Sequence, residues 1–244
     1  MAISELQLPA SVKAHELADS NSLAATLAHD VAERLRQAIA SKGQACVVLS
    51  GGRSPVPFLE QLAAQVLDWS KVTVSLADER WVPVEHADSN AGLLARHLLK
   101  GAAAKARFIG LYQAAANLEA AAEQADQALA DLPPIDVLVL GMGDDGHTAS
   151  LFPASPNLRQ GLAKVGERRC LPMLAPSVPH QRLSMTRALR QVSEKFSCSG
   201  PLRSCMPLSR PCSLVITRSE MPSSGCRRMI SLLPICKRCS GAKM

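Results

Sequence analysis

Short apolar runs alternate with stretches of helical character over most of the chain. Three runs, Ala45 to Leu49, Val72 to Leu76 and Ile135 to Leu140, are too short for buried helices and are predicted as strands. Four stretches between or before them are predicted as helices: 23–39, 55–67, 90–99 and 117–132. Strands alternating with helices predict an α/β fold with a mainly parallel, open, Rossmann-like sheet and helices on both faces.

The first helix has the clearest boundaries. Apolar residues recur every four positions from Leu23 to Ile39, Ser20 or Asn21 is the expected N-cap, and Gly43 is the expected stop.

Three loops follow predicted strands, and they contain most of the unusual residues of the chain. Their sequences are SGGRSP (50–55), DERWVP (78–83) and GMGDDGHTASLFP (141–153). Ligands of open α/β sheets bind beyond the carboxyl ends of the strands. We therefore expect one composite site.

The first loop is typical of a phosphate-binding turn. Gly51 and Gly52 allow close approach of the backbone, Arg53 adds positive charge, and Ser54 offers a hydroxyl. Free N–H groups at the start of the next helix favour an anion. A tight turn with an N-cap is the alternative. The loop is not a P-loop, because GxxxxGK[ST] is absent.

The second loop places three charges in a row at the end of a buried strand. Asp78, Glu79 and Arg80 must pair with each other or face a polar cleft, because unpaired buried charge is costly. A structural ion pair is the alternative for any one of them. As a group they suit a site that positions a substrate and stabilises developing negative charge. His86 follows, the only other histidine near a predicted site loop.

The third loop contains the candidate base. Gly141, Gly143 and Gly146 formally spell GxGxxG, but Pro153 shortens the helix that a dinucleotide site requires. His147, in a glycine-rich turn beside two carboxylates, is suited to accepting a proton at neutral pH. A helix-capping or core histidine is the alternative.

The net charge of +6 divides unevenly at about residue 190. Residues 1–189 hold 17 basic and 19 acidic side chains, and residues 190–244 hold 10 and 2, which together give the 27 and 21 of the whole chain. The tail also contains six of the eight cysteines. No run of about 18 apolar residues predicts a membrane helix, and the N-terminus lacks the basic and apolar order of a secretion signal. We expect a cytoplasmic protein.

The tail, 190–244, differs from the rest of the chain in composition and shows no periodicity of helix or strand. Cys236 and Cys239 form CxxC, but no second pair completes a zinc site, and disulfides do not suit an unexported chain. Our hypothesis is a change of reading frame at or near Leu189, and an evolved, disordered basic extension is the alternative.

Taken together, the motifs resemble those of the 6-phosphogluconolactonase family. The segments are LSGGRSP, ADERWVP with HADSN, DVLVLGMGDDGHTASLFP and QRLSMT, in this order between about residues 15 and 189. The resemblance implies a fold shared with glucosamine-6-phosphate deaminases. It also implies hydrolysis of 6-phospho-D-glucono-1,5-lactone in the oxidative pentose phosphate pathway, without a metal or an organic cofactor.

The resemblance also implies roles for individual residues. His147 matches the histidine that activates water, and Arg80 with Asp78 matches the motif that contacts the sugar acid and the oxyanion. The phosphate-binding positions that it implies are Gly51, Gly52, Arg53, Ser54 and Arg182.

Three other functions are alternatives to lactone hydrolysis. An amino-sugar-phosphate isomerase or deaminase shares the glycine loop and DGH, but HTASLFP and DERWVP favour the lactonase. The second alternative is a sugar-phosphate-binding regulator without catalysis. The third is a nucleic-acid binder acting through the tail, but the tail has only one aromatic residue, Phe196, for stacking on bases. We therefore expect a small phosphorylated lactone as partner, and neither nucleic acid nor membrane. The oligomeric state stays open.

Overall fold

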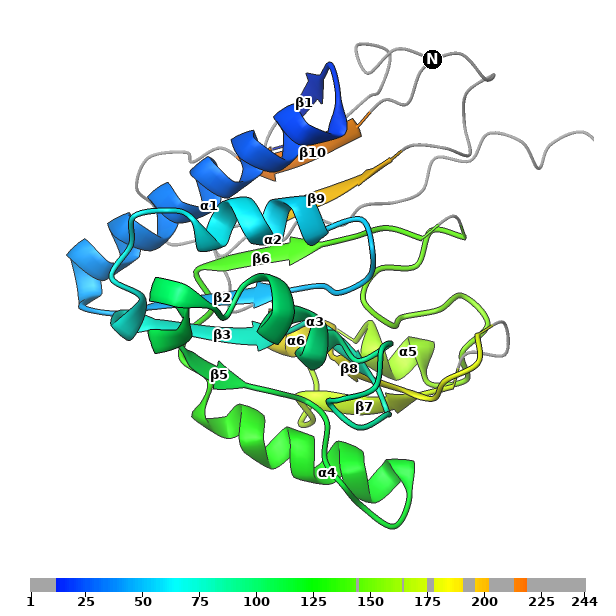
Figure 1. The fold of residues 1–244 in the computed structure, drawn as a ribbon. Coiled ribbons are helices and arrows are strands. Elements are labelled where there is room, and N and C mark those ends of the chain that lie inside the picture. Colours follow the sequence, from blue (N-terminus) through cyan, green and yellow to red (C-terminus); the bar gives the residue numbers. More distant parts are fainter. Residues whose placement is uncertain are drawn as a thin grey trace, which may run out of the picture.

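The computed structural model describes residues 12–143, 145–163, 165–174, 178–190, 196–201 and 213–218, which form two sheets and the helices around them (Figure 1). The large sheet has the order β1-β10-β9-β6-β2-β3-β5, and a small sheet has the order β4-β8-β7. The strands of the large sheet, in chain order, are β1 (Val12–Leu17), β2 (Ala45–Leu49), β3 (Val72–Leu76), β5 (Arg107–Ile109), β6 (Val137–Leu140), β9 (Phe196–Pro201) and β10 (Ser213–Arg218). Those of the small sheet are β4 (Asp78–Arg80), β7 (Cys170–Met173) and β8 (Arg182–Met185).

Helices flank the sheet. The α-helices are α1 (Ser20–Lys42), α2 (Val56–Ala63), α3 (Asn90–His97), α4 (Leu118–Ala128), α5 (Leu158–Gly161) and α6 (Arg187–Arg190). Short 3-10 helices cover Trp69–Lys71, Gly101–Lys105 and Leu129–Asp131. In Figure 1, α1 and α2 lie beside each other, and α4 lies near β7 at the opposite end of the molecule.

The centre of the large sheet is parallel. Strand β2 pairs in parallel with β3 and β6, β3 pairs in parallel with β5, and β6 with β9. The antiparallel pairs, β1 with β10 and β10 with β9, lie at one edge. The predicted mainly parallel sheet flanked by helices is therefore confirmed, and the three predicted strands correspond to β2, β3 and β6.

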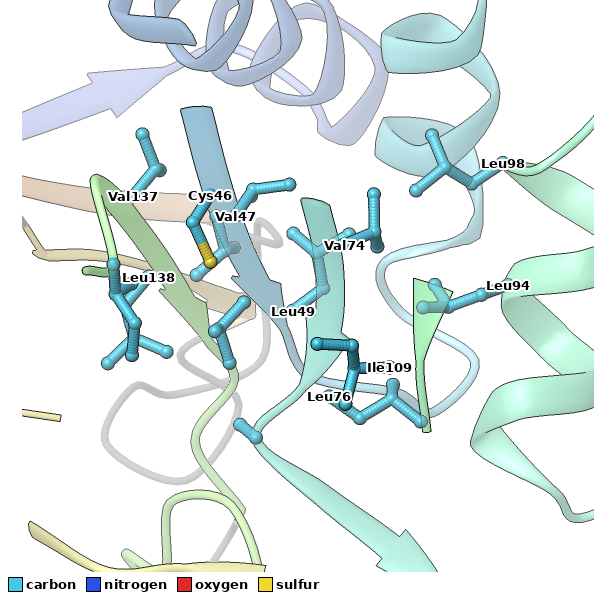
Figure 2. Packing of buried hydrophobic residues seen from close by; sticks show 14 of the residues in the cluster. Cys46, Val47, Leu49, Val74, Leu76, Leu94, Leu98, Ile109, Val137 and Leu138 are labelled. Carbon is cyan, nitrogen blue, oxygen red and sulfur yellow. The ribbon is translucent and has the colours of Figure 1, made fainter. Parts of the chain in front are cut away.

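The core lies between the central strands and the helices. All five residues of β2 and of β3 are buried, as expected for strands covered on both faces. Figure 2 shows Val47 of β2 beside Val74 of β3, with Leu94 of α3 nearby. Because this packing holds β2 and β3 in place, the loops that follow these strands start from fixed positions.

The N-terminus of α1 differs from the prediction by one residue. Asp19, not Ser20 or Asn21, is the N-cap, because its carboxylate accepts hydrogen bonds from two backbone N–H groups of the first turn. Gly43 ends the helix as predicted, with a φ of 79° that favours glycine.

The tail contributes two strands that the sequence pattern did not predict. Strand β9 extends the parallel sheet beside β6, and β10 fills the place between β9 and β1. Each strand has six residues, which is too short a segment among the surrounding prolines for a periodic pattern to be recognised. The strands form because their backbones pair with neighbouring strands, which the local sequence does not reveal. These two segments therefore form strands although the residue pattern after Leu189 gives no signal for them. The CxxC pair, Cys236 and Cys239, lies outside the described residues, as do three other cysteines of the tail: Cys205, Cys212 and Cys226.

Among the described residues, no helix is both long and apolar enough to cross a membrane.

Candidate active site

A cleft of about 210 Å³ opens where the loops after β2, β3 and β6 meet. Its walls include Gly51, Gly52, Arg53, Ser54, Asp78, Arg80, His147 and Arg182, but not Glu79, the third charge of the DER segment. Arg182 comes from β8 of the small sheet, whose pairing with β4 brings it to the cleft. The expected convergence of three loops is therefore present, with a fourth segment added.

The alternation of side chains along β4 separates the three charges of the DER segment. Asp78 and Arg80 line the cleft, and Glu79 points the other way and is fully buried. The Glu79 carboxylate accepts hydrogen bonds from the backbone N–H groups of Asn90 and Ala91, both at 2.7 Å. It thus binds the N-terminus of α3 and fixes β4 against that helix. Burial raises the pKa of the Glu79 carboxyl to about 7, although these hydrogen bonds act to lower it.

Asn90 connects the charged strand to the glycine turn, and the sequence analysis had not assigned it to the site. Its Oδ1 accepts a hydrogen bond from an Arg80 guanidinium nitrogen at 2.7 Å, and its Nδ2 donates to the Asp78 carbonyl at 2.9 Å. The amide also lies against Gly51, where an added Cβ would come within 1.8 Å of Oδ1. Gly51 is therefore required for this close approach.

The Asp78 carboxylate is held by a buried hydroxyl. Ser150, which is 1% exposed, donates from Oγ to Asp78 Oδ2 at 2.6 Å. The contact joins the loop after β6 to β4 across 72 residues of sequence. The next residue towards the N-terminus, Ala149, also lines the cleft and has a φ of 52°, in the left-handed region that a residue with a Cβ rarely adopts.

His147 is oriented by the residues around it. Its Nδ1 lies 2.5 Å from Asp145 Oδ1, and its ring packs on Phe152 with a centroid separation of 4.2 Å. A carboxylate only accepts hydrogen bonds, so Nδ1 carries the proton and Nε2 has the free lone pair. Gly143 makes room for the ring, since a Cβ there would lie 2.2 Å from it.

The environment of Asp145 favours its charged form. Burial acts to raise the pKa of this carboxyl, but the side-chain and backbone hydrogen bonds from His147 outweigh it and lower the pKa. An ionised carboxylate at this position stabilises the imidazolium that forms when Nε2 accepts a proton.

Arg182 is a buried cation at the wall of the cleft. It is 7% exposed, and burial, followed by the positive charge of Arg80, lowers the pKa of its guanidinium. Its Nε and the Oγ of Ser50 are buried without a hydrogen-bond partner among the described residues. Both atoms belong to residues that line the cleft.

These features together define a class of protein: an α/β enzyme with a parallel sheet, a basic cleft at the carboxyl ends of its strands and an oriented histidine. Comparisons with known proteins give the particular family. The family model described as glucosamine-6-phosphate isomerases/6-phosphogluconolactonase matches residues 18–197, and the chain belongs to this family.

Individual relatives agree with this assignment. The chain is 83% identical over 189 residues to a protein of Pseudomonas putida named 6-phosphogluconolactonase, and the match covers 78% of each chain. It is 67% identical over 190 residues to a protein of the same name from Pseudomonas aeruginosa, covering 78% of this chain and 80% of that one.

Among solved structures, a 6-phosphogluconolactonase from Shewanella baltica has a TM-score of 0.72 at 36% identity and covers 75% of this chain and 78% of its own. A monomeric glucosamine-6-phosphate deaminase, 18% identical, has a TM-score of 0.59, which shows the shared fold alone.

Proposed function

We propose that the chain hydrolyses 6-phospho-D-glucono-1,5-lactone to 6-phospho-D-gluconate, the second step of the oxidative pentose phosphate pathway. The relatives with 83% and 67% identity both carry the name of this activity. The observation that carries the proposal is that the oriented His147 shares one cleft with three arginines, Arg53, Arg80 and Arg182. Hydrolysis of a phosphorylated ester requires a base that activates water and cations that bind the phosphate and the oxyanion.

In the proposed reaction, His147 Nε2 accepts a proton from a water molecule while the water oxygen attacks the lactone carbonyl carbon. The carbonyl oxygen becomes an oxyanion beside the guanidinium of Arg80, which Asp88 and Asn90 hold in position through their oxygen atoms. The bond between the carbonyl carbon and the ring oxygen then breaks, and the imidazolium returns its proton to the ring oxygen. Asp145 keeps the imidazole in the required tautomer throughout.

The phosphate has a separate set of candidate partners. Gly51, Gly52, Arg53 and Ser54 form the turn between β2 and α2, and the buried Arg182 faces the same cleft. Guanidinium groups and backbone N–H groups are the donors that bind phosphate most strongly. Asp78 is proposed to accept a hydrogen bond from a sugar hydroxyl, because its carboxylate keeps acceptor capacity after binding Ser150.

The test compares two reactions on the same sample. Lactone opening, followed by coupling 6-phosphogluconate to its dehydrogenase, is expected to be measurable, and ammonia release from glucosamine 6-phosphate is expected to be absent. His147→Ala is expected to lower lactone turnover by at least about 100-fold with an unchanged unfolding midpoint. Ammonia release without lactone opening would overturn the proposal, and unchanged turnover of the variant would remove His147 from the mechanism.

A further inference from the structure

Two histidines and one aspartate gather beside the cleft without lining it. His86 and Asp88 lie in the loop between β4 and α3, and His180 lies just before β8, 92 residues after Asp88. Histidine and carboxylate are common ligands of transition metals, and this is the one such group of three found among the described residues. The proposed hydrolysis uses none of them.

The three donor atoms are already close to the spacing that one metal ion requires. All lie within 4.8 Å of one another, with His180 Nε2 at 3.0 Å and His86 Nδ1 at 3.9 Å from Asp88 Oδ2. Ligands at about 2.1 Å from a tetrahedral ion lie about 3.4 Å apart, so only small side-chain movements are needed. The two imidazole rings meet edge to face at a centroid distance of 5.4 Å.

The exposure of the group also suits a cation. His86 Nδ1 accepts a hydrogen bond from the backbone N–H of Asp88 at 3.1 Å, and His180 Nε2 contacts the Asp88 carboxylate at 3.0 Å, so a bound ion would replace both hydrogen bonds. The side chains are 44%, 58% and 25% exposed for His86, Asp88 and His180, which leaves room for water to complete the coordination.

We propose that His86, Asp88 and His180 bind one divalent transition-metal ion, with Zn²⁺ as the best fit. Two imidazoles select such an ion over Mg²⁺ and Ca²⁺, which prefer oxygen ligands. The bound ion fastens the loop after β4 to the segment before β8. Each of these segments adjoins a cleft arginine, because Arg80 donates to the Asp88 carbonyl and His180 lies two residues before Arg182. The ion has a linking role, and no step of the hydrolysis passes through it.

The test titrates metal-free protein with Zn²⁺ and with Co²⁺ under reducing conditions. One ion per chain is expected to bind with micromolar affinity at about pH 7.5. His86→Ala and His180→Ala are each expected to weaken binding at least 10-fold. His97→Ala is the matched control, because His97 contacts the Glu60 carboxylate at 2.9 Å and the described residues add no third ligand there.

Cysteine binding is separated by the Co²⁺ spectrum, since a thiolate ligand adds an intense near-ultraviolet charge-transfer band that histidine and aspartate do not. A visible Co²⁺ band without that feature, lost in His86→Ala and His180→Ala and kept in His97→Ala, supports the site. Absence of binding, binding that both ligand variants retain, or a spectrum dominated by thiolate would overturn it. None of these outcomes depends on lactone hydrolysis.

Discussion

Arg80 and Arg182 are directly opposite each other in the antiparallel pair formed by β4 and β8. Both line the cleft, so two guanidinium groups share one surface of the small sheet. Like charges at opposed positions of a strand pair destabilise it. The arrangement is therefore suited to an anion that neutralises both, and the folded chain is expected to lose some stability for the sake of binding.

Replacing Arg182 with methionine tests this trade-off. Arg182→Met keeps the length of the side chain and removes a buried charge, so the free energy of unfolding is expected to rise by about 1 kcal/mol. The KM for the lactone is expected to rise at least 10-fold, because a phosphate partner is lost. Urea unfolding and steady-state kinetics give the two values. Arg53→Met is the control, since Arg53 is exposed and its loss should raise KM without stabilising the chain. A less stable Arg182→Met with ordinary KM would contradict the interpretation.

Asp145 is expected to act on turnover through His147. Asp145→Asn can present its amide N–H to Nδ1, which favours the wrong tautomer, so kcat is expected to fall by about 100-fold or more with little change in KM or melting temperature. Glu60→Gln is the matched control, because it changes the carboxylate of a second histidine pair away from the cleft. If both variants lose activity equally, or neither does, Asp145 has no positioning role.

The space that Gly143 leaves for the imidazole is expected to be essential. A Cβ in Gly143→Ala would lie 2.2 Å from His147 and must displace its ring, so turnover is expected to fall at least 10-fold while the fold persists. Gly166→Ala is the control, since its Cβ would meet only an ordinary contact at 3.9 Å. Kinetics together with circular dichroism provide the comparison, and equal activities of the two variants would show that the ring can move without consequence.

Glu79 is expected to make stability depend on pH. Its pKa is raised from 4.5 to about 7, so the folded state binds this proton more tightly than the unfolded state does. The stabilisation is complete below pH 4.5, declines between pH 4.5 and 7, and is absent above about pH 7. The total is at most about 3 kcal/mol.

Glu79→Gln removes the titration and keeps a similar shape. Urea unfolding at several values between about pH 4.5 and 8 is expected to show wild-type stability falling relative to the variant across that window. Parallel pH profiles for the two proteins would show that Glu79 does not titrate there.

The sequence contained enough information for the sheet centre and for the three loops, because short apolar runs and glycine turns are local signals. The three predicted strands and the shared family with its fold are confirmed. The small sheet was not predicted, since β4 has three residues and β7 and β8 have four, too short for periodicity. The opposition of Arg80 and Arg182 depends on that pairing and could not be read from the residues alone.

The side chains missed at the site were missed for a similar reason. Asn90 follows a helix-capping segment, and Ser150 and Phe152 read as ordinary loop residues. Their contacts with Arg80, Asp78 and His147 join parts of the chain that only the tertiary structure brings together. Ser150 and Phe152 belong to the HTASLFP segment, so that motif was the available signal.

The reading-frame hypothesis for residues 190–244 remains a prediction. Resequencing the coding DNA around Leu189 is expected to show a change of frame. Expression and kinetic assays are expected to show a low soluble yield and weak turnover of this chain. The reason is that β9 and β10 supply the pairing between β6 and β1, so an altered tail affects one edge of the large sheet. A clean in-frame DNA sequence with a matching intact mass would contradict the change of reading frame. Soluble protein with ordinary turnover would contradict the expected loss of folding and activity.

Because Arg182 lines the cleft, the affinity for substrate can also serve as a measure of folding. This arginine reaches the cleft only when β8 pairs with β4, and β8 is followed by α6, which ends at residue 190. Substrate affinity therefore reports whether the polypeptide has folded correctly up to the point where its composition changes. A kinetic assay on successive truncations would locate, residue by residue, how much of the tail the enzyme can lose before its structure is affected.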